Sequence, residues 1–76
     1  MTISADQCRA GRALVKMTQT QLSEASNVSL RSIINFEKGE RTPVPNNMAA
    51  LRSALEAAGV EFIDRNGGGP GVRLRE

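Results

Sequence analysis

The chain has 76 residues and a mass of 8.2 kDa, enough for one small domain with a modest core, which excludes a two-domain enzyme. It contains no His and one Cys, which excludes nearly every kind of Cys/His zinc site and His-assisted catalytic site. A single Cys also excludes a disulfide within the chain. The net charge of +2 argues only weakly for a polyanionic partner. We therefore expect no enzyme activity, no cofactor and no metal. The first residues show no signal-peptide pattern, so we expect a cytoplasmic protein with no membrane contact.

The first predicted helix runs from about residue 5 to residue 15. Ser4 precedes it and Gln7 follows three residues later, which is the capping-box spacing. Apolar and small residues recur on one helical face, at Cys8, Gly11, Leu14 and Val15. We expect this face to pack closely against other helices, with Cys8 as a buried small apolar residue rather than a redox centre.

A second, short helix is predicted to end near Ala25. Thr18 and Gln21 repeat the capping-box spacing at its start. Asn27, which follows the helix, is one of the few non-glycine residues that tolerate a left-handed backbone. The sequence therefore predicts a tight turn at this position.

The third predicted helix covers residues 30–38. Ser29 can cap its start, and Gly39 stands where glycine best ends a helix. Four apolar residues of the second and third helices are expected to face inward: Leu22, Val28, Ile33 and Phe36. Two short helices joined by a tight turn form a helix-turn-helix, whose second helix enters the DNA major groove.

A loop rich in Pro and Asn leads to a fourth predicted helix over residues 47–58, with Met48, Leu51 and Leu55 on one face. After it, Val60 and Phe62 on one side of a glycine-rich turn, and Val72 and Leu74 on the other, alternate with other residues. This period of two predicts a two-stranded hairpin. Its strands could pair edge to edge with a second chain, or could pack Phe62 and Leu74 back on the fourth helix.

Residues 18–39 resemble the lambda-repressor-like, XRE or Cro/repressor helix-turn-helix family. The family pattern is met at Thr18, Gln19, Leu22, Val28, Ser29, Ile33, Glu37 and Gly39. Three residues depart from it: Ser23 replaces a usual Ala, and Lys16 and Asn27 stand where Gly is common. Each substitute is tolerable, because Ser is small and Asn can adopt the same left-handed conformation.

The resemblance implies a mostly α fold, with four to five helices in a lambda-repressor-like DNA-binding domain and a C-terminal β-hairpin. We expect the DNA-binding domain to cover residues 1–59, with the helix-turn-helix proper at 18–39. Residues 60–76 are expected to form a hairpin or tail that could serve dimerisation. In the family, Arg12 and Glu37 occupy the positions of a partly buried structural ion pair.

Two sets of DNA contacts are expected. Side chains on the third helix offer the chemistry that reads bases: Arg31 can donate two hydrogen bonds to guanine, Asn35 can pair with adenine, and Leu30 can contact a thymine methyl, while Ser32 is a further candidate. The helix starts and the end of the third helix offer phosphate contacts, at Thr18, Gln19, Ser29, Lys38 and Arg41.

The resulting hypothesis is a sequence-specific transcriptional regulator, a repressor or autoregulator, that binds double-stranded DNA as a homodimer through helix 30–38. The alternative is an antitoxin or adaptor whose main role is to hold a toxin-like partner protein through the tail at residues 64–76. Deleting residues 60–76 separates the two, because an adaptor would lose its partner and keep its DNA binding.

Overall fold

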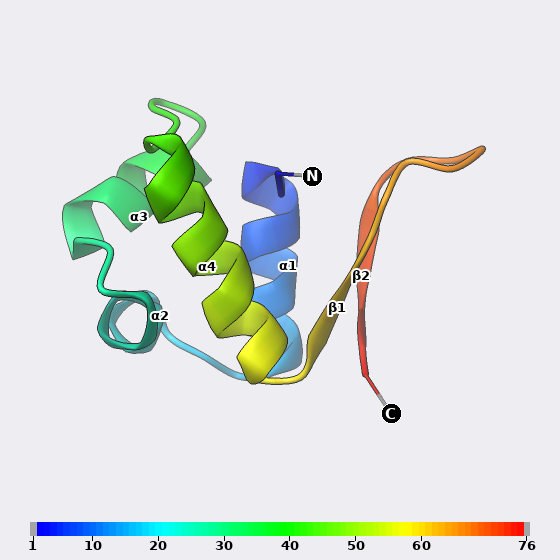
Figure 1. Ribbon diagram of the computed structural model, residues 1–76, viewed down its shortest axis with the longest axis horizontal. Helices are drawn as coiled ribbons and strands as arrows, with labels where there is room; N and C mark the ends of the chain where they lie inside the picture. Colours follow the sequence, from blue (N-terminus) through cyan, green and yellow to red (C-terminus); the bar gives the residue numbers. More distant parts are fainter. Residues whose placement is uncertain (1, 76) are drawn as a thin grey trace.

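A computed structural model describes residues 2–75. In chain order the elements are α1 (Ala5–Leu14), α2 (Gln19–Ser26), α3 (Leu30–Glu37), α4 (Pro45–Ala57), β1 (Val60–Ile63) and β2 (Gly71–Leu74) (Figure 1). The predicted class, mostly helical with a C-terminal β-hairpin, is confirmed. Four helices occur in this described range, the lower of the two expected numbers.

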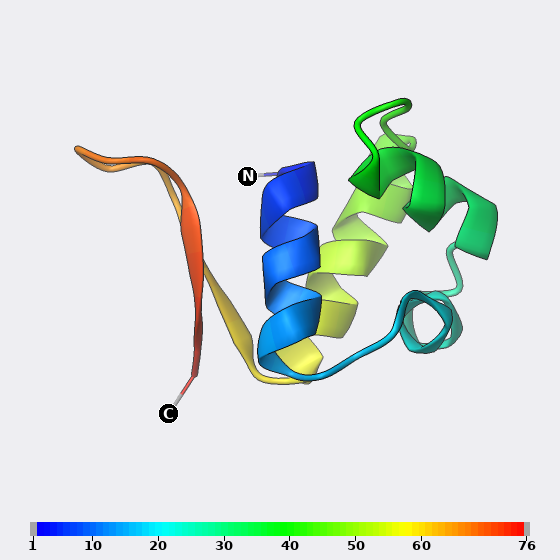
Figure 2. The same cartoon turned by 180° about the vertical axis from the view of Figure 1, so that it is seen from behind.

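The four helices pack together, and the hairpin stands beside them (Figure 1). The strands of the hairpin overlap in this view, so the small sheet is seen edge-on with one face toward α1 and α4. From behind, α1 and β2 lie in front, while α2 and α3 occupy the end of the molecule remote from the hairpin (Figure 2). The helix-turn-helix and the hairpin therefore lie at opposite ends of the long axis, which measures 33 Å.

Local sequence explains the helix starts. Both predicted capping boxes form: Ser4 Oγ accepts from the Gln7 amide at 3.0 Å, and Thr18 Oγ1 accepts from the Gln21 amide at 3.0 Å. The fourth helix begins at Pro45, two residues earlier than predicted. The sequence predicts a loop at Pro45, but the fixed φ of proline suits the first helical position, where its missing N–H needs no partner.

The two non-glycine residues with positive φ lie just after helices. Lys16 after α1 and Asn27 after α2 adopt φ values of 56° and 61°, which is the left-handed conformation expected of Asn27. Lys16, which stands where Gly is common in the family, thus takes the backbone conformation that Gly adopts most readily. Neither departure from the family pattern prevents the turn that it occupies.

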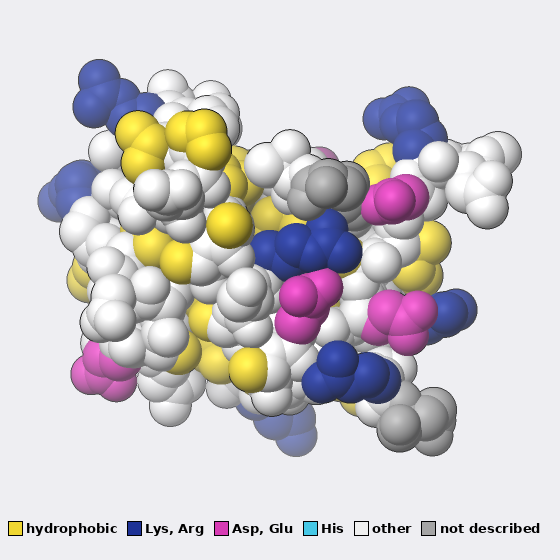
Figure 3. All heavy atoms as spheres, viewed as in Figure 1, with side chains coloured by type: hydrophobic (Ala, Val, Ile, Leu, Met, Phe, Trp, Pro, Cys, Tyr) yellow, Lys and Arg dark blue, Asp and Glu magenta, His cyan; other side chains and the backbone are white. Residues whose placement is uncertain are grey.

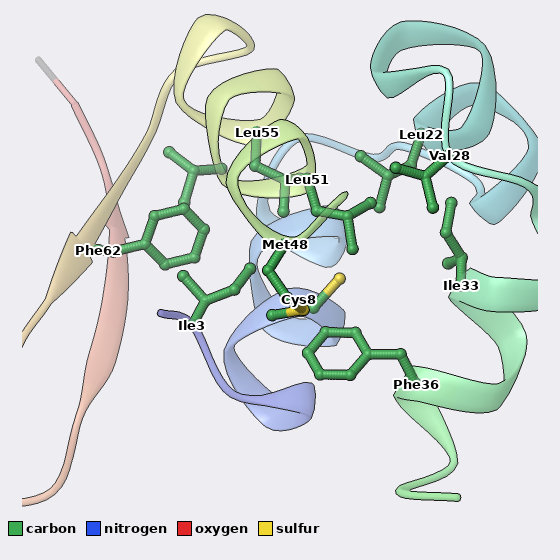
Figure 4. Close-up of a cluster of buried hydrophobic side chains, with 11 residues drawn as sticks. Ile3, Cys8, Leu22, Val28, Ile33, Phe36, Met48, Leu51, Leu55 and Phe62 are labelled. Carbon is green, nitrogen blue, oxygen red and sulfur yellow. The ribbon is translucent and has the colours of Figure 1, made fainter. Parts of the chain in front are cut away.

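The core draws apolar side chains from all four helices and from β1 (Figure 4). Its members are Ile3, Cys8, Leu22, Val28, Ile33, Phe36, Met48, Leu51, Leu55, Val60 and Phe62. The inward positions predicted for the helix-turn-helix and the fourth helix are confirmed, as is burial of Cys8. One prediction for the first helix is wrong: Leu14 is 38% exposed, because α1 buries only Gln7, Cys8 and Gly11 and Leu14 is its last residue.

The hairpin pairs antiparallel with Val60 opposite Leu74 and Phe62 opposite Val72. Phe62 packs into the core and has the guanidinium of Arg52 at 5.3 Å from its ring centroid. Leu74 does not pack back in the same way, since it is 51% exposed at the outer strand.

Gln7 attaches the hairpin to α1. Its side-chain Nε2 donates to the carbonyl oxygens of Gly71 at 3.1 Å and Ile63 at 3.4 Å, while its Oε1 accepts from the Ser4 amide at 2.8 Å. Gln7 is 5% exposed, and all of its amide atoms have partners. One residue thus caps a helix and holds a sheet at the same time.

Candidate nucleic-acid interface

The second and third helices are set at a fixed angle by the turn between them. Ser23, the departure from the usual Ala, donates its hydroxyl to the Val28 carbonyl at 2.6 Å, while Ser26 Oγ accepts from the Val28 amide at 3.2 Å. Val28 itself is buried. The turn is therefore held by hydrogen bonds on both sides of a buried apolar residue.

The carboxylate of Glu37, which is only 4% exposed, joins three helices. Arg12 from α1 donates through Nε to Oε2 at 2.8 Å and through Nη2 to Oε1 at 2.6 Å. Gln19 from α2 donates to Oε1 at 3.0 Å, and the Cys8 thiol donates to Oε2 at 3.1 Å. The last turn of α3 is thereby fixed against α1 and against the first turn of α2.

The pKa values follow from these contacts. Burial by itself raises the pKa of Glu37, but hydrogen bonds from Arg12, Cys8 and Gln19 outweigh it, and the net pKa is below the ordinary value. The hydrogen bond to Glu37 raises the pKa of Arg12. Burial, followed by the hydrogen bond to Glu37, raises the pKa of the Cys8 thiol. Near neutral pH the group is a charged pair with a neutral thiol beneath it.

Sequence reasoning missed two of the side chains that brace this group. Arg9 Nη1 donates to the main-chain carbonyl oxygen of Glu37, and Arg9 Nη2 pairs with Asp6. The sequence predicts Cys8 as a buried apolar residue, but its thiol also donates a hydrogen bond to a carboxylate. The available signal was spacing, because Cys8, Arg9 and Arg12 lie within one turn of α1 and can face the same neighbour.

The candidate base contacts on α3 differ in exposure. Arg31 is exposed and Leu30 is 38% exposed, both in the first turn, while Ser32 and Asn35 are half-buried. Ser32 shares a hydrogen bond with Ser29, at 2.9 Å between their hydroxyl oxygens. Arg31 and Asn35 are four residues apart and so lie on one helical face.

The candidate phosphate contacts fall into separate places. Thr18, Gln19 and Lys38 border one hollow, together with Arg9, Arg12, Ile34 and Glu37. Ser29 caps the opposite end of α3, where its side chain accepts from the Ser32 amide. Arg41 is exposed in the following loop, and its amide donates to the Asn35 carbonyl at 3.4 Å.

Charge on the rest of the surface is mixed. Figure 3 shows basic and acidic side chains interspersed over α4 and the hairpin on one face of the molecule. Two ion pairs lie on these elements: Arg52 with Glu56 at 2.9 Å, and Arg73 with Glu61 at 2.8 Å. Among residues 2–75, no group of His, Cys, Asp or Glu is arranged to hold a metal ion.

Comparison with known protein families shows to which family this chain belongs. Residues 9–61 match the sequence model of the family HTH_3, described as Helix-turn-helix. The chain belongs to this helix-turn-helix family. The match covers the last six residues of α1, all of α2 to α4 and the start of β1, so it includes the α2–α3 unit and most of the helix that braces it.

As a helix-turn-helix protein of the XRE, lambda-repressor-like type, the chain is a DNA-binding transcription regulator. No curated protein matched it in sequence. None of the helices in residues 2–75 has the length and apolar character needed to cross a membrane.

Proposed function

We propose that this helix-turn-helix protein is a repressor or autoregulator that reads a palindromic DNA site as a homodimer, with α3 in the major groove. The observation that carries the proposal is that Arg31 and Asn35 lie on one face of α3. The opposite face of this helix is buried, and its last turn is held by the hydrogen bonds that Arg12 and Gln19 donate to Glu37. Arg and Asn side chains make the bidentate contacts that distinguish guanine and adenine. A helix held at both its core face and its last turn can present them at a fixed angle.

Phosphate contacts in this proposal come from two helix starts and from nearby side chains. Gln19 Nε2 uses one N–H on Glu37, so its second N–H can donate to a phosphate oxygen. Amides in the first turns of α2 and α3 have no partner within their helices, and Thr18 and Ser29 stand at these two starts. Lys38 and Arg41 add positive charge at the other end of α3. A small net charge is compatible with this arrangement.

The test is selection of bound duplexes from a random library at about 0.15 M salt, followed by titration of the selected duplex and its single-base variants. We expect a palindrome whose half-sites lose definition at one position in Arg31→Ala and at another in Asn35→Ala, each by about 1–3 kcal/mol. Gln19→Ala should weaken every duplex alike.

The matched comparison is Arg75→Ala, a basic residue on the hairpin remote from α3, which should change neither affinity nor base choice. Uniform losses for Arg31→Ala and Gln19→Ala across all duplexes would contradict the base-reading role of α3. Failure to enrich any sequence would contradict the proposal as a whole.

A further inference from the structure

The loop at the tip of the hairpin is not held by the sheet. Ladder pairing ends where Ile63 faces Gly71, so residues 64–70 join β1 to β2 without a ladder pair. Every residue of this loop is exposed, and the loop projects away from the four helices (Figure 1). Backbone with few contacts changes conformation at a low cost in free energy. We therefore expect this loop to sample many backbone conformations while the rest of the chain stays folded.

Within this loop Asn66 is followed directly by Gly67. Among residues 2–75, neither the side-chain amide of Asn66 nor the N–H of Gly67 has a hydrogen-bond partner. A Cβ built at Gly67 would meet nothing within 4 Å, so the space around this residue is open. A bond from the Gly67 nitrogen to Cγ of Asn66 would close a five-membered ring, a size that forms readily. Glycine, having no Cβ, leaves the nitrogen uncrowded and lets the backbone turn toward the ring geometry.

We propose that Asn66 is a site of spontaneous deamidation. Hydroxide removes the N–H proton of Gly67, the nitrogen attacks Cγ of Asn66, and the side-chain nitrogen leaves as ammonia after taking a proton from water. The cyclic imide that results is then hydrolysed at one of its two carbonyl groups. Hydrolysis at one carbonyl gives aspartate at position 66, and hydrolysis at the other gives isoaspartate, in which the main chain runs through the former side chain. Water and hydroxide are the only co-reactants.

The other asparagines of the chain lack this combination of features. After Asn27, the amide of Val28 donates to Ser26 Oγ at 3.2 Å, and Val28 is only 2% exposed. The attacking nitrogen at that position is therefore both engaged and shielded. The remaining asparagines lie in helices, whose backbone dihedrals are fixed: Asn35 in α3, and Asn46 and Asn47 in α4. The chain thus contains its own set of comparison sites.

The reaction changes charge without touching the packed part of the chain. It replaces a neutral amide by a carboxylate and so lowers the formal net charge by one from +2. The new charge lies at the hairpin tip, at the end of the long axis opposite the helix-turn-helix. Since no ladder pair and no core side chain belongs to this loop, the fold should survive the change. The inference does not depend on the proposed function, and it is tested without DNA.

The first experiment follows ageing of the full chain by peptide mass spectrometry, at two pH values on either side of neutrality. We expect the peptide that contains Asn66 to gain the mass difference between an amide NH₂ group and a hydroxyl group, before any other asparagine reacts. The rate should rise with the hydroxide concentration. Both aspartate and isoaspartate should form, because the ring can open at either carbonyl. Far-UV circular dichroism of the aged chain should match that of the fresh chain.

The second experiment compares native and urea-unfolded chains. Asn66 should react at a similar rate in both, because the fold neither engages nor covers Gly67. Asn27 should react faster when unfolded, because its neighbour Val28 then loses its hydrogen bond and its burial. A native chain in which Asn66 is strongly protected relative to the unfolded chain would overturn the inference.

Two matched variants test the role of the following glycine. Gly67→Ala should slow the reaction several-fold, because a Cβ crowds the nitrogen and restricts the backbone. Gly69→Ala makes the same change two residues further on, where a Cβ also meets nothing within 4 Å, and should leave the rate unchanged. Equal rates in the two variants, formation of aspartate without isoaspartate, or earlier reaction at another asparagine would each contradict the proposal.

Discussion

The side-chain amide of Gln19 lies 3.0 Å from the carboxylate of Glu37, which joins the first turn of α2 to the last turn of α3. The same carboxylate holds Arg12 of α1 and the thiol of Cys8. The position and orientation of α3 therefore depend on one buried charge. Changes at Glu37 are expected to affect stability and DNA reading together.

Glu37→Gln should destabilise the chain by about 3 kcal/mol, because the guanidinium of Arg12 would be left mostly buried without its counter-charge. Chemical denaturation measures the change in the free energy of unfolding. Glu56→Gln is the matched control: it breaks the pair with Arg52, which is more exposed, and should cost less than about 0.5 kcal/mol. Equal losses in the two variants would show that burial of the Arg12–Glu37 pair has no energetic consequence.

Acid should unfold the wild type through Glu37. Its pKa is lower in the folded chain than in the unfolded one, so the stabilisation is fully present above the unfolded value of about 4.3. It is lost as pH falls below that value toward the folded pKa. Melting temperatures between pH 7 and pH 3 should therefore fall more steeply for the wild type than for Glu37→Gln. Parallel pH profiles for the two chains would rule out this linkage.

Gln7→Ala should loosen the hairpin from α1. It removes donors to the Gly71 and Ile63 carbonyls as well as a capping contact, and hydrogen exchange of amides in residues 60–75 should accelerate. Gln21→Ala breaks the equivalent capping contact of α2, where Gln21 is exposed. That variant should leave hairpin exchange unchanged. Faster hairpin exchange in both variants would mean that helix capping, and not the tertiary contact, controls it.

Gly11→Ala should stabilise the chain by about 0.5–1 kcal/mol, since alanine favours a helix interior over glycine. A Cβ at this position would lie 3.4 Å from Val60 Cγ1 and 3.7 Å from Leu55 Cδ1, which is ordinary contact distance. Gly11→Val should instead destabilise by about 1–3 kcal/mol through overpacking. Thermal melts of the two variants measure both effects. A lower melting temperature for Gly11→Ala would contradict the prediction and would show that α1 and the hairpin cannot move apart to make room for the added methyl group.

Features governed by neighbouring residues could be predicted from the sequence. The caps at Ser4, Thr18 and Ser29 and the turn at Asn27 depend on contacts a few positions apart, and the period of two predicted the two strands of the hairpin. The boundary error at Pro45 arose because a proline fits equally well in a loop or at the first helical position.

Contacts between segments that are distant in the sequence were harder to predict. The attachment of Gln7 to β2 spans 64 positions, and no local pattern distinguishes it from an ordinary capping residue. Leu14 fitted the apolar stripe of the first helix, yet the hairpin covers only part of that face. In the candidate interface, the positions of Arg31 and Asn35 followed from helical spacing, whereas the donors that Cys8 and Arg9 supply to Glu37 required the packed arrangement of α1 against α3.

Each of the four helices is followed by a residue with a left-handed backbone, and glycine fills that position after α3 and α4 but not after α1 and α2. Lys16 therefore holds the chain in a conformation that its side chain disfavours, while Asn27 tolerates the same conformation less readily than glycine would. Natural variation at these two positions has room to raise the melting temperature without touching the core or the side chains proposed to contact DNA. The tolerance of this small protein to otherwise harmful mutations would then be adjustable at two surface turns.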